Sequence, residues 1–369
     1  MVINMKPNLE PKYTVFVNVE QILAPETLSK LLSKPITHVE CQPMKEHSGL
    51  AGGQLSYVYT NVGRLVLKQM SMHSDWIMFS SADHQCRSVA LWQYGLLDQL
   101  RPQVEHEIIG CARDGEGWAI LMNDLTGCVH SWDKSIPPEQ IPVFLDSLAR
   151  IHAAFWNNPR LKDSRLGLCD VTTLIDQTSP TVARKYVDGG LGVLPTWIHG
   201  GWQVMKDLLD PDVFAQMNNL IENRQPLLDA LSRYPVTLLH GDYRADNLAY
   251  PNYPAVLDWQ EASYALMTID LAWFVLQDFG RESIEQTEII KYYRRQLETY
   301  LHQRFDDTDW QAMLDLGFLV NALRSTCFAA FWYKQNDIEN NIQERDYHES
   351  RVKVRNQQVR DALRWLNIP

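Results

Sequence analysis

The stretch LLHGDYRADNLAYPNYPAVLDW, residues 238–259, places a run of polar residues between two short apolar segments. Asp242 and Asn247 are five positions apart, and Asp258 follows eleven positions later, at the end of the second apolar segment. Aspartate, asparagine and glycine are also common in ordinary turns. Taken alone, the stretch is compatible with an ordinary turn or with a catalytic loop. Residues elsewhere in the chain are needed to distinguish these two interpretations.

The three residues suit the transfer of a phosphoryl group from a nucleotide. Asp242 is a carboxylate that could orient an accepting hydroxyl and take its proton, which makes it the candidate catalytic residue. Mg²⁺ prefers carboxylate and amide oxygens, and Asp258 and Asn247 offer one of each as candidate metal ligands. The transition state of this reaction is loose, so positioning and charge neutralisation matter more than strong base catalysis.

HGDYRADN followed by LDW resembles the catalytic and metal motifs of the aminoglycoside phosphotransferase and choline kinase superfamily. These are small-molecule kinases with a protein-kinase-like fold. The resemblance implies an α+β, bilobal fold with a small sheet-rich N-lobe and a large, mostly helical C-lobe. It also implies ATP and Mg²⁺ as cofactors and a small hydroxylated molecule as the substrate. Two such motifs in this order rarely arise together by chance.

Further stretches match the same superfamily where it contacts the nucleotide. GRLVLK puts Lys68 at the end of an expected strand, where the family has its phosphate-pairing lysine. ILMNDLTG resembles the connector between the lobes, which implies that the backbone at Asn123 and Leu125 binds the adenine edge. In TIDLAWFV, Asp270 resembles the aspartate that supports the catalytic loop.

Two stretches depart from the family pattern. LAGGQLSYVY contains Gly52 and Gly53 as candidate phosphate-binding glycines, without the regular spacing of a protein-kinase glycine loop. The helix expected over residues 83–100 would carry, in the family, a glutamate that pairs with the strand lysine, and Ser88 stands at that position. Asp83 is an acid on the same expected helix, and it could replace the glutamate only in a different register.

The rest of the chain predicts how the elements are distributed. The expected parts are an N-lobe with an antiparallel sheet and one main helix (1–122), a connector (123–127) and a helical C-lobe (128–369). Apolar runs on either side of Asn61–Gly63 and of Asp114–Gly117 predict two hairpins. Helical periodicity extends from Met267 to Leu366. The only strand-like runs expected in the C-lobe, PVTLLH and YPAVLDW, flank the catalytic loop.

Four further polar residues, three in the loop and one in a separate helix, receive supporting roles in this interpretation. Asp246 is expected to brace the loop, and Arg244 to form a salt bridge, with a phosphate clamp as its alternative. His240 is expected to hold the loop by hydrogen bonds rather than to act as a base. His152 has apolar helix neighbours, so we expect a buried, hydrogen-bonded histidine there.

Composition limits the class of protein. The chain has 369 residues, with 45 acids, 34 bases and a net charge of −11, which argues against a nucleic-acid partner and favours a cationic substrate slightly. Six scattered cysteines without a CxxC pair, and an N-terminus without a signal-peptide pattern, predict a cytoplasmic protein. The most apolar segments contain Asp270 or Arg324 and are expected to be too short and too polar to span a membrane.

Two alternatives to a metabolite kinase remain open. Ser88 and the irregular glycine stretch favour a kinase-like pseudoenzyme or ligand-binding protein without turnover, although Asp242, Asn247 and Asp258 are all present. A protein kinase fits less well, because the loop reads HGD rather than HRD and no APE-like segment follows. No motif selects among amino alcohols, aminoglycosides, sugars and amino acids, between ATP and GTP, or among oligomeric states.

Overall fold

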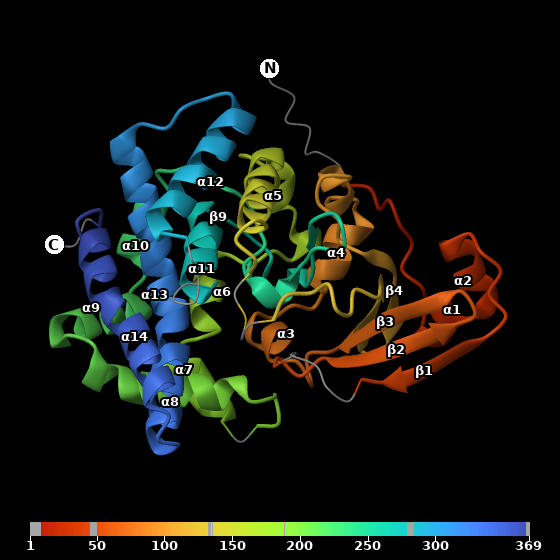
Figure 1. Ribbon diagram of the computed structural model, residues 1–369, viewed down its shortest axis with the longest axis horizontal. Coiled ribbons are helices and arrows are strands. Elements are labelled where there is room, and N and C mark those ends of the chain that lie inside the picture. Colours follow the sequence, from red (N-terminus) through yellow and green to blue (C-terminus); the bar gives the residue numbers. More distant parts are fainter. Residues whose placement is uncertain are drawn as a thin grey trace.

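The computed structural model describes residues 9–44, 50–131, 134, 136–187, 189–278 and 284–366. An antiparallel sheet occupies the N-terminal part and the remainder is mostly helical, which confirms the expected fold class (Figure 1). We call the elements α1 to β5 the N-lobe and the elements α5 to α14 the C-lobe. The sheet ends at Asn123, and the boundaries at residues 122 and 127 remain a prediction.

The N-lobe sheet has the strand order β1-β2-β3-β5-β4, and each neighbouring pair is antiparallel. Its strands are β1 (Val39–Pro43), β2 (Gln54–Thr60), β3 (Gly63–Met70), β4 (Ile108–Asp114) and β5 (Gly117–Asn123). Both expected hairpins are present, since Thr60 pairs with Gly63 and Asp114 pairs with Gly117. The sequence does not predict β1, which is short, largely exposed and rich in polar residues.

Among its described residues, the N-lobe contains four short α-helices rather than one main helix. They are α1 (Val19–Leu23), α2 (Pro25–Leu32), α3 (Trp76–Ser80) and α4 (Arg87–Gln93). The helix expected over residues 83–100 is therefore only partly correct. α4 ends at Gln93 because Gly95 adopts a left-handed conformation with φ +67°, and the separate 3₁₀ helix η1 (Leu97–Leu100) follows.

The C-lobe is built around one long helix, α13, which packs along α8, α11 and α14 (Figure 1). Its helices are α5 (Ile141–Ala154), α6 (Val171–Asp176), α7 (Pro180–Ala183), α8 (Leu194–Leu208), α9 (Pro211–Glu222), α10 (Gln225–Leu231), α11 (Thr268–Asp278), α12 (Gln286–Leu301), α13 (Asp307–Ile338) and α14 (Ile342–Leu363). The last four confirm the helical periodicity expected from Met267 onwards.

Within the described residues, α13 is the one helix long and apolar enough to cross a membrane by length and composition. It has 32 residues, so the expectation that its apolar segment is too short and too polar is wrong. However, 89% of its most apolar stretch is buried inside the protein. Packing against neighbouring helices therefore accounts for its apolar character, as in any central core helix.

Two small antiparallel sheets surround the catalytic loop. Their strands pair as β6 (Thr237–Leu239) with β9 (Ser263–Ala265), and β7 (Leu248–Ala249) with β8 (Ala255–Val256). The runs PVTLLH and YPAVLDW correspond to β6 and β8, but these strands do not pair with each other. The loop thus leaves one sheet and enters the other, and Asp258 follows directly after β8 and Leu257.

One hydrophobic cluster extends through both lobes. It joins N-lobe residues such as Trp76 and Ile120 to C-lobe residues such as Phe144 and Leu148. Part of the sheet therefore shares a cluster with the C-lobe helices, which lie beside the sheet in Figure 1, and a second cluster is confined to the N-lobe. The catalytic loop lies where the two lobes meet (Figure 1).

Candidate active site

Asp270 of α11 holds the start of the catalytic loop. Its carboxylate is fully buried and accepts hydrogen bonds from the backbone amides of His240, at 2.7 Å, and Gly241, at 2.9 Å. On its other side, His152 Nε2 lies 3.3 Å from Asp270, and His152 Nδ1 contacts the hydroxyl of Tyr293. The loop-supporting position of Asp270 and the buried, hydrogen-bonded state of His152 are confirmed.

His240 ties the loop to the segment before Asp258. Its Nδ1 accepts a hydrogen bond from the amide of Asp242 at 3.2 Å, so Nε2 carries the proton and donates to the carbonyl of Leu257 at 2.8 Å. The histidine holds the loop by hydrogen bonds, as expected. Position 241, between His240 and Asp242, requires glycine. Gly241 has φ +85°, and a Cβ there would lie 2.1 Å from the backbone oxygen of Glu261.

The carboxylate of Asp242 receives three side-chain donors. Trp273 Nε1 donates to Oδ1 and Asn247 Nδ2 donates to Oδ2, each at 2.9 Å. Arg244 Nε lies 3.0 Å from Oδ1 and 3.1 Å from Oδ2. Burial is the largest single influence and acts to raise the pKa of Asp242, but the lowering influences together, led by the charge of Arg244, outweigh it, and the pKa is lowered. The group is therefore ionised at neutral pH.

Arg244 lies between the two acids of the loop. Besides Asp242, its guanidinium pairs with Asp246 at 3.1 Å, which confirms the expected salt bridge. Burial raises the pKa of Asp246, because the charged form is partly removed from water. Asp246 is thus a brace for the loop through Arg244, in agreement with its expected role.

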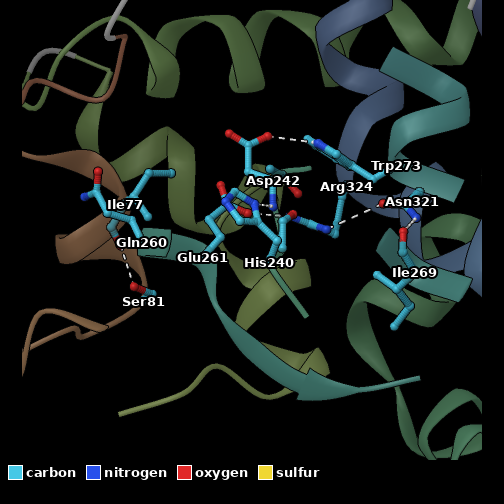
Figure 2. A network of polar contacts seen from close by, with 12 residues as sticks. Ile77, Ser81, His240, Asp242, Gln260, Glu261, Ile269, Trp273, Asn321 and Arg324 are labelled. Atoms are coloured by element: carbon cyan, nitrogen blue, oxygen red, sulfur yellow. Dashed lines mark hydrogen bonds and ion pairs between the residues drawn. The ribbon is translucent and has the colours of Figure 1, made fainter. Parts of the chain in front are cut away.

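A buried arginine of α13 closes the back of the loop (Figure 2). Arg324 donates to the carbonyl of Gly241 at 2.9 Å, forms a short ion pair with Glu261, and lies over the ring of Trp273 at 4.3 Å. Burial raises the pKa of Glu261 to about 7 against the charge of Arg324, and the nearby charge of Asp242 raises it further.

Asn247 and Asp258 lie on adjoining backbone, since the amide of Leu257 donates to the carbonyl of Asn247 at 2.9 Å. Both side-chain hydrogen bonds of Asn247 are donated by Nδ2, to the carbonyl and carboxylate of Asp242, so its Oδ1 remains available. Oδ1 of Asp258 is buried and has no hydrogen-bond partner in the described part of the chain. These two oxygens fit Mg²⁺, which commonly takes one or two protein ligands plus phosphates and waters.

The described ranges contain no cluster of three or more His, Cys, Asp or Glu residues that could hold a metal ion by themselves. A magnesium site of the kind that nucleotide phosphates complete does not need one. The assignment of Asn247 and Asp258 as ligands stays a prediction.

Lys68 of β3 is the N-lobe residue that contacts Asp258. Its Nζ pairs with Oδ2 of Asp258 at 2.7 Å and donates to Oε1 of Gln260 at 2.6 Å. A Cβ on Gly53 would lie 3.5 Å from Lys68 Cε, so this candidate phosphate-binding glycine borders the lysine. Gly52 has a different reason to be glycine, because a Cβ there would lie 1.9 Å from the backbone oxygen of Ser74.

The candidate adenine contacts lie at the end of β5. The amide of Asn123 already donates to the carbonyl of Glu107 at 3.0 Å, so a ligand contact there would fall to the Asn123 carbonyl. The Leu125 carbonyl accepts from the amide of Cys128 at 2.8 Å, and no described residue accepts a hydrogen bond from the Leu125 amide. The Leu125 amide could therefore donate a hydrogen bond to adenine, and the Asn123 carbonyl could accept one from it.

The helix that carries the family's glutamate provides no acid in this chain. Ser88 of α4 is buried, and its hydroxyl has no hydrogen-bond partner among the described residues. Asp83 precedes α4 instead of lying on it, accepts the amide of Arg87 at 2.9 Å and pairs with its guanidinium at 3.5 Å. The idea that Asp83 replaces the glutamate is therefore wrong.

A sheet-bearing N-lobe over a helical C-lobe, with the catalytic loop facing the lysine of β3, is the arrangement of a protein-kinase-like fold. The model of a family described as "Phosphotransferase enzyme family" matches residues 192–316, which include Asp242, Asn247 and Asp258. No protein in the curated collection matches the sequence. The family match confirms the resemblance to the aminoglycoside phosphotransferase and choline kinase superfamily, and the solved structures below share the fold.

Two solved structures share this fold over most of their length. A microcompartment-associated aminopropanol kinase is 14% identical, with a TM-score of 0.51 over 92% of this chain and 99% of that one. An ethanolamine kinase from Plasmodium vivax is 10% identical, with a TM-score of 0.52 over 85% of this chain and 81% of that one. At these identities the likeness concerns the fold, whereas the family match supports a small-molecule phosphotransferase.

Five side chains of this site are not predicted from the sequence: Asp75, Gln260, Glu261, Trp273 and Arg324. Only Trp273 could have been predicted from the sequence, because of its spacing from Asp270. It follows Asp270 by three positions on one helix, so both side chains face the catalytic loop. The others meet the loop or the lysine through contacts between distant parts of the chain.

Proposed function

We propose that this chain transfers the γ-phosphoryl group of ATP to a hydroxyl of a small metabolite, with Mg²⁺ as the metal ion. The observation that carries the proposal is the junction at Asp258. Lys68 of the N-lobe pairs with it at 2.7 Å. The catalytic loop is hydrogen-bonded to the preceding residue, Leu257, from both His240 and Asn247. The match of residues 192–316 to a phosphotransferase family supports the same reaction.

In this reaction Asp242 orients the acceptor hydroxyl and takes its proton. Its lowered pKa makes it a weak base, which suffices because a loose transition state depends more on positioning than on base strength. Lys68 contacts the phosphates, while the Asn123 carbonyl and the Leu125 amide receive the adenine edge. Oδ1 of Asn247 and Oδ1 of Asp258 would hold Mg²⁺, which neutralises phosphate charge when bound.

The acceptor is proposed to be a small hydroxylated molecule. The net charge of −11 favours a cationic one slightly. The two kinases of similar fold act, by their descriptions, on aminopropanol and ethanolamine. Amino alcohols therefore belong in the first test panel, together with aminoglycosides, sugars and amino acids.

The test is an ADP-release screen of purified protein with ATP and Mg²⁺ against that panel, with Asp242→Asn as the blank. We expect at least one acceptor to give turnover in the wild type. In the variant we expect turnover to fall by about 10²- to 10⁴-fold, as for loss of a general base. Calorimetric titration of ATP should give similar affinities for both proteins. Full turnover by Asp242→Asn would overturn the assignment.

A kinase-like pseudoenzyme is the alternative suggested by Ser88, and none of the comparisons supports it. Firm ATP binding without turnover on the whole panel would favour it over the kinase. We further propose a cytoplasmic location, because all six cysteines are unpaired and four of them are buried.

A further inference from the structure

Lys68 needs an acid to hold it, and α4 does not provide one. In this structure the lysine pairs with Oδ2 of Asp258, and the proposed function assigns the other carboxylate oxygen of this residue, Oδ1, to the metal ion. The second partner of Lys68 is the side-chain oxygen of Gln260, two residues further along. Gln260 is 4% exposed, so its amide has to be paired inside the protein.

Gln260 connects Lys68 to a buried carboxylate by hydrogen bonds. Its Nε2 donates to Oδ1 of Asp75 at 3.2 Å, while its Oε1 accepts from Lys68 at 2.6 Å. The two contacts fix which end of the amide faces which partner. Figure 2 shows Gln260 beside Ile77 and Ser81 of the α3 region, which Asp75 begins as its N-cap.

Asp75 is a carboxylate with one unused oxygen. The residue is fully buried, and its Oδ1 also accepts the amide of Met78 at 3.0 Å. Its Oδ2 is buried with no hydrogen-bond partner among the described residues. A buried carboxylate with only neutral partners is unfavourable unless a cation compensates its charge.

Lys68 is that cation. Burial raises the pKa of Asp75, and the charge of Lys68 is the largest influence that lowers it. A Cβ on Gly53 would lie 3.4 Å from Oδ2 of Asp75 and 3.5 Å from Cε of Lys68. The unused oxygen and the lysine side chain therefore border the same point beside the candidate phosphate-binding glycine.

We propose that Asp75, acting through Gln260, is the acid that positions Lys68, in place of the helix glutamate that this chain lacks. The inference rests on the proposed kinase function. Asp75 and Gln260 are positioning residues: they keep the ammonium of Lys68 directed at the phosphates when Asp258 is engaged by the metal ion. Ser88 has no part in this arrangement.

The test compares Asp75→Asn, Gln260→Glu and the double variant. Asparagine keeps the volume and the cap on α3 but removes the charge. We expect kcat/KM for ATP to fall about 10- to 100-fold, the usual effect of losing a hydrogen bond to a charged group, with the melting temperature retained. Glutamate at 260 puts two carboxylates in contact and should also lower kcat/KM.

The double variant exchanges the amide and the carboxylate, so that the acid contacts Lys68 directly. We expect it to recover at least half of the lost activity, because the charge beside the lysine is restored. A purely capping role of Asp75 would give no rescue and would overturn the proposal. If Asp75→Asn does not fold, Asp75→Ser keeps the cap and allows the same comparison.

Ser88→Ala is the matched control for the helix position and should leave kcat and KM unchanged. ATP affinity, measured by calorimetry, should weaken in Asp75→Asn and recover in the double variant, and this readout does not require an acceptor. Unchanged kinetics and ATP affinity in Asp75→Asn, with an active wild type, would overturn this inference alone. A wild type without turnover on any acceptor would instead count against the proposed function.

Discussion

At the scale of the residue, the proposed chemistry depends on keeping Asp242 ionised and fixed in direction. Its three side-chain donors come from the loop itself and from α11. Arg244 and Asn247 follow it closely in sequence, whereas Trp273 reaches it from 31 positions away. A carboxylate has about four acceptor sites, so these donors still leave room for a substrate hydroxyl.

Trp273→Phe tests the contact from α11. Phenylalanine keeps a ring beside Arg324 but removes Nε1, the donor to Oδ1 of Asp242. We expect kcat to fall about tenfold, since hydrogen bonds to charged groups are worth about 1.5–3 kcal/mol. The control is Trp202→Phe, which removes a buried indole bond to Thr178 outside the site. Equal effects of the two substitutions on kcat would contradict the expected role.

Glu261 should make stability depend on pH. Burial raises its pKa from 4.5 to about 7. Between these values the folded protein binds more protons than the unfolded chain, so the contribution of Glu261 to stability falls as pH rises through this interval. We expect Glu261→Gln to gain stability relative to wild type over the interval, by at most about 3 kcal/mol. Urea denaturation of both proteins from about pH 4.5 to about pH 7.5 measures the difference, and a constant difference would contradict it.

Sequence motifs identify those site residues that lie close to one another in the sequence or at the end of a recognisable strand. Asp242, Asn247 and Asp258 are of this kind, and their spacing can be read directly. Asp75 and Gln260 cannot be found in this way, because 185 positions separate them and only the packing of α3 on the segment after Asp258 brings them together. Arg324 and Glu261 are not predictable from the sequence for the same reason, because 63 positions separate them and only packing brings them together.

At the scale of the element, the helices are predictable because long amphipathic or apolar periodicity survives in the sequence. β7 and β9 have two and three residues, which is too short for an alternating pattern. The segment 83–100 looks like one helix because its apolar spacing continues across Gly95. The left-handed backbone of that glycine divides it, and this is a local event that periodicity does not reveal.

The crossing of α8 and α13 provides a prediction at this scale. A Cβ on Gly201 would lie 1.8 Å from the backbone oxygen of Cys327, so the helices approach as closely as glycine allows. We expect Gly201→Ala to lower stability by about 2–3 kcal/mol, since the contact is with backbone. Gly200→Ala is the matched control, because its nearest neighbour is the ring of Phe331 at 3.2 Å, which can shift. Thermal denaturation should separate the two variants, and equal melting temperatures would contradict the close crossing.

At the scale of the whole molecule, the lobes are tied by apolar and polar contacts together. The main hydrophobic cluster includes residues of both lobes. Arg87 of α4 adds polar ties, donating to the carbonyls of Gly167, at 2.5 Å, and Gln260, at 3.1 Å. The bilobal architecture follows from the sequence through the order of its elements and its family resemblance. The shared core does not, because it depends on which faces meet after folding.

This shared core predicts how the protein unfolds. Two lobes with no hydrophobic cluster in common would melt separately, whereas a main cluster with residues of both lobes should give a single cooperative transition. We expect one heat-absorption peak in calorimetry, with the same midpoint by circular dichroism and by tryptophan fluorescence. The proposed site for ATP with Mg²⁺ lies where the lobes meet, so we expect this ligand to raise the one midpoint without splitting it. Ligand at 100 times its Kd adds about 2.7 kcal/mol.

Asp258→Asn is the control, and its midpoint should rise less, because it loses the charge that pairs with Lys68 and is expected to hold the metal ion. Two separated peaks in the absence of nucleotide would show that the lobes are energetically independent. A nucleotide-induced shift confined to one of two peaks would mean that ATP binds one lobe alone. Either result would contradict a site built jointly by β3, the catalytic loop and the segment after β8.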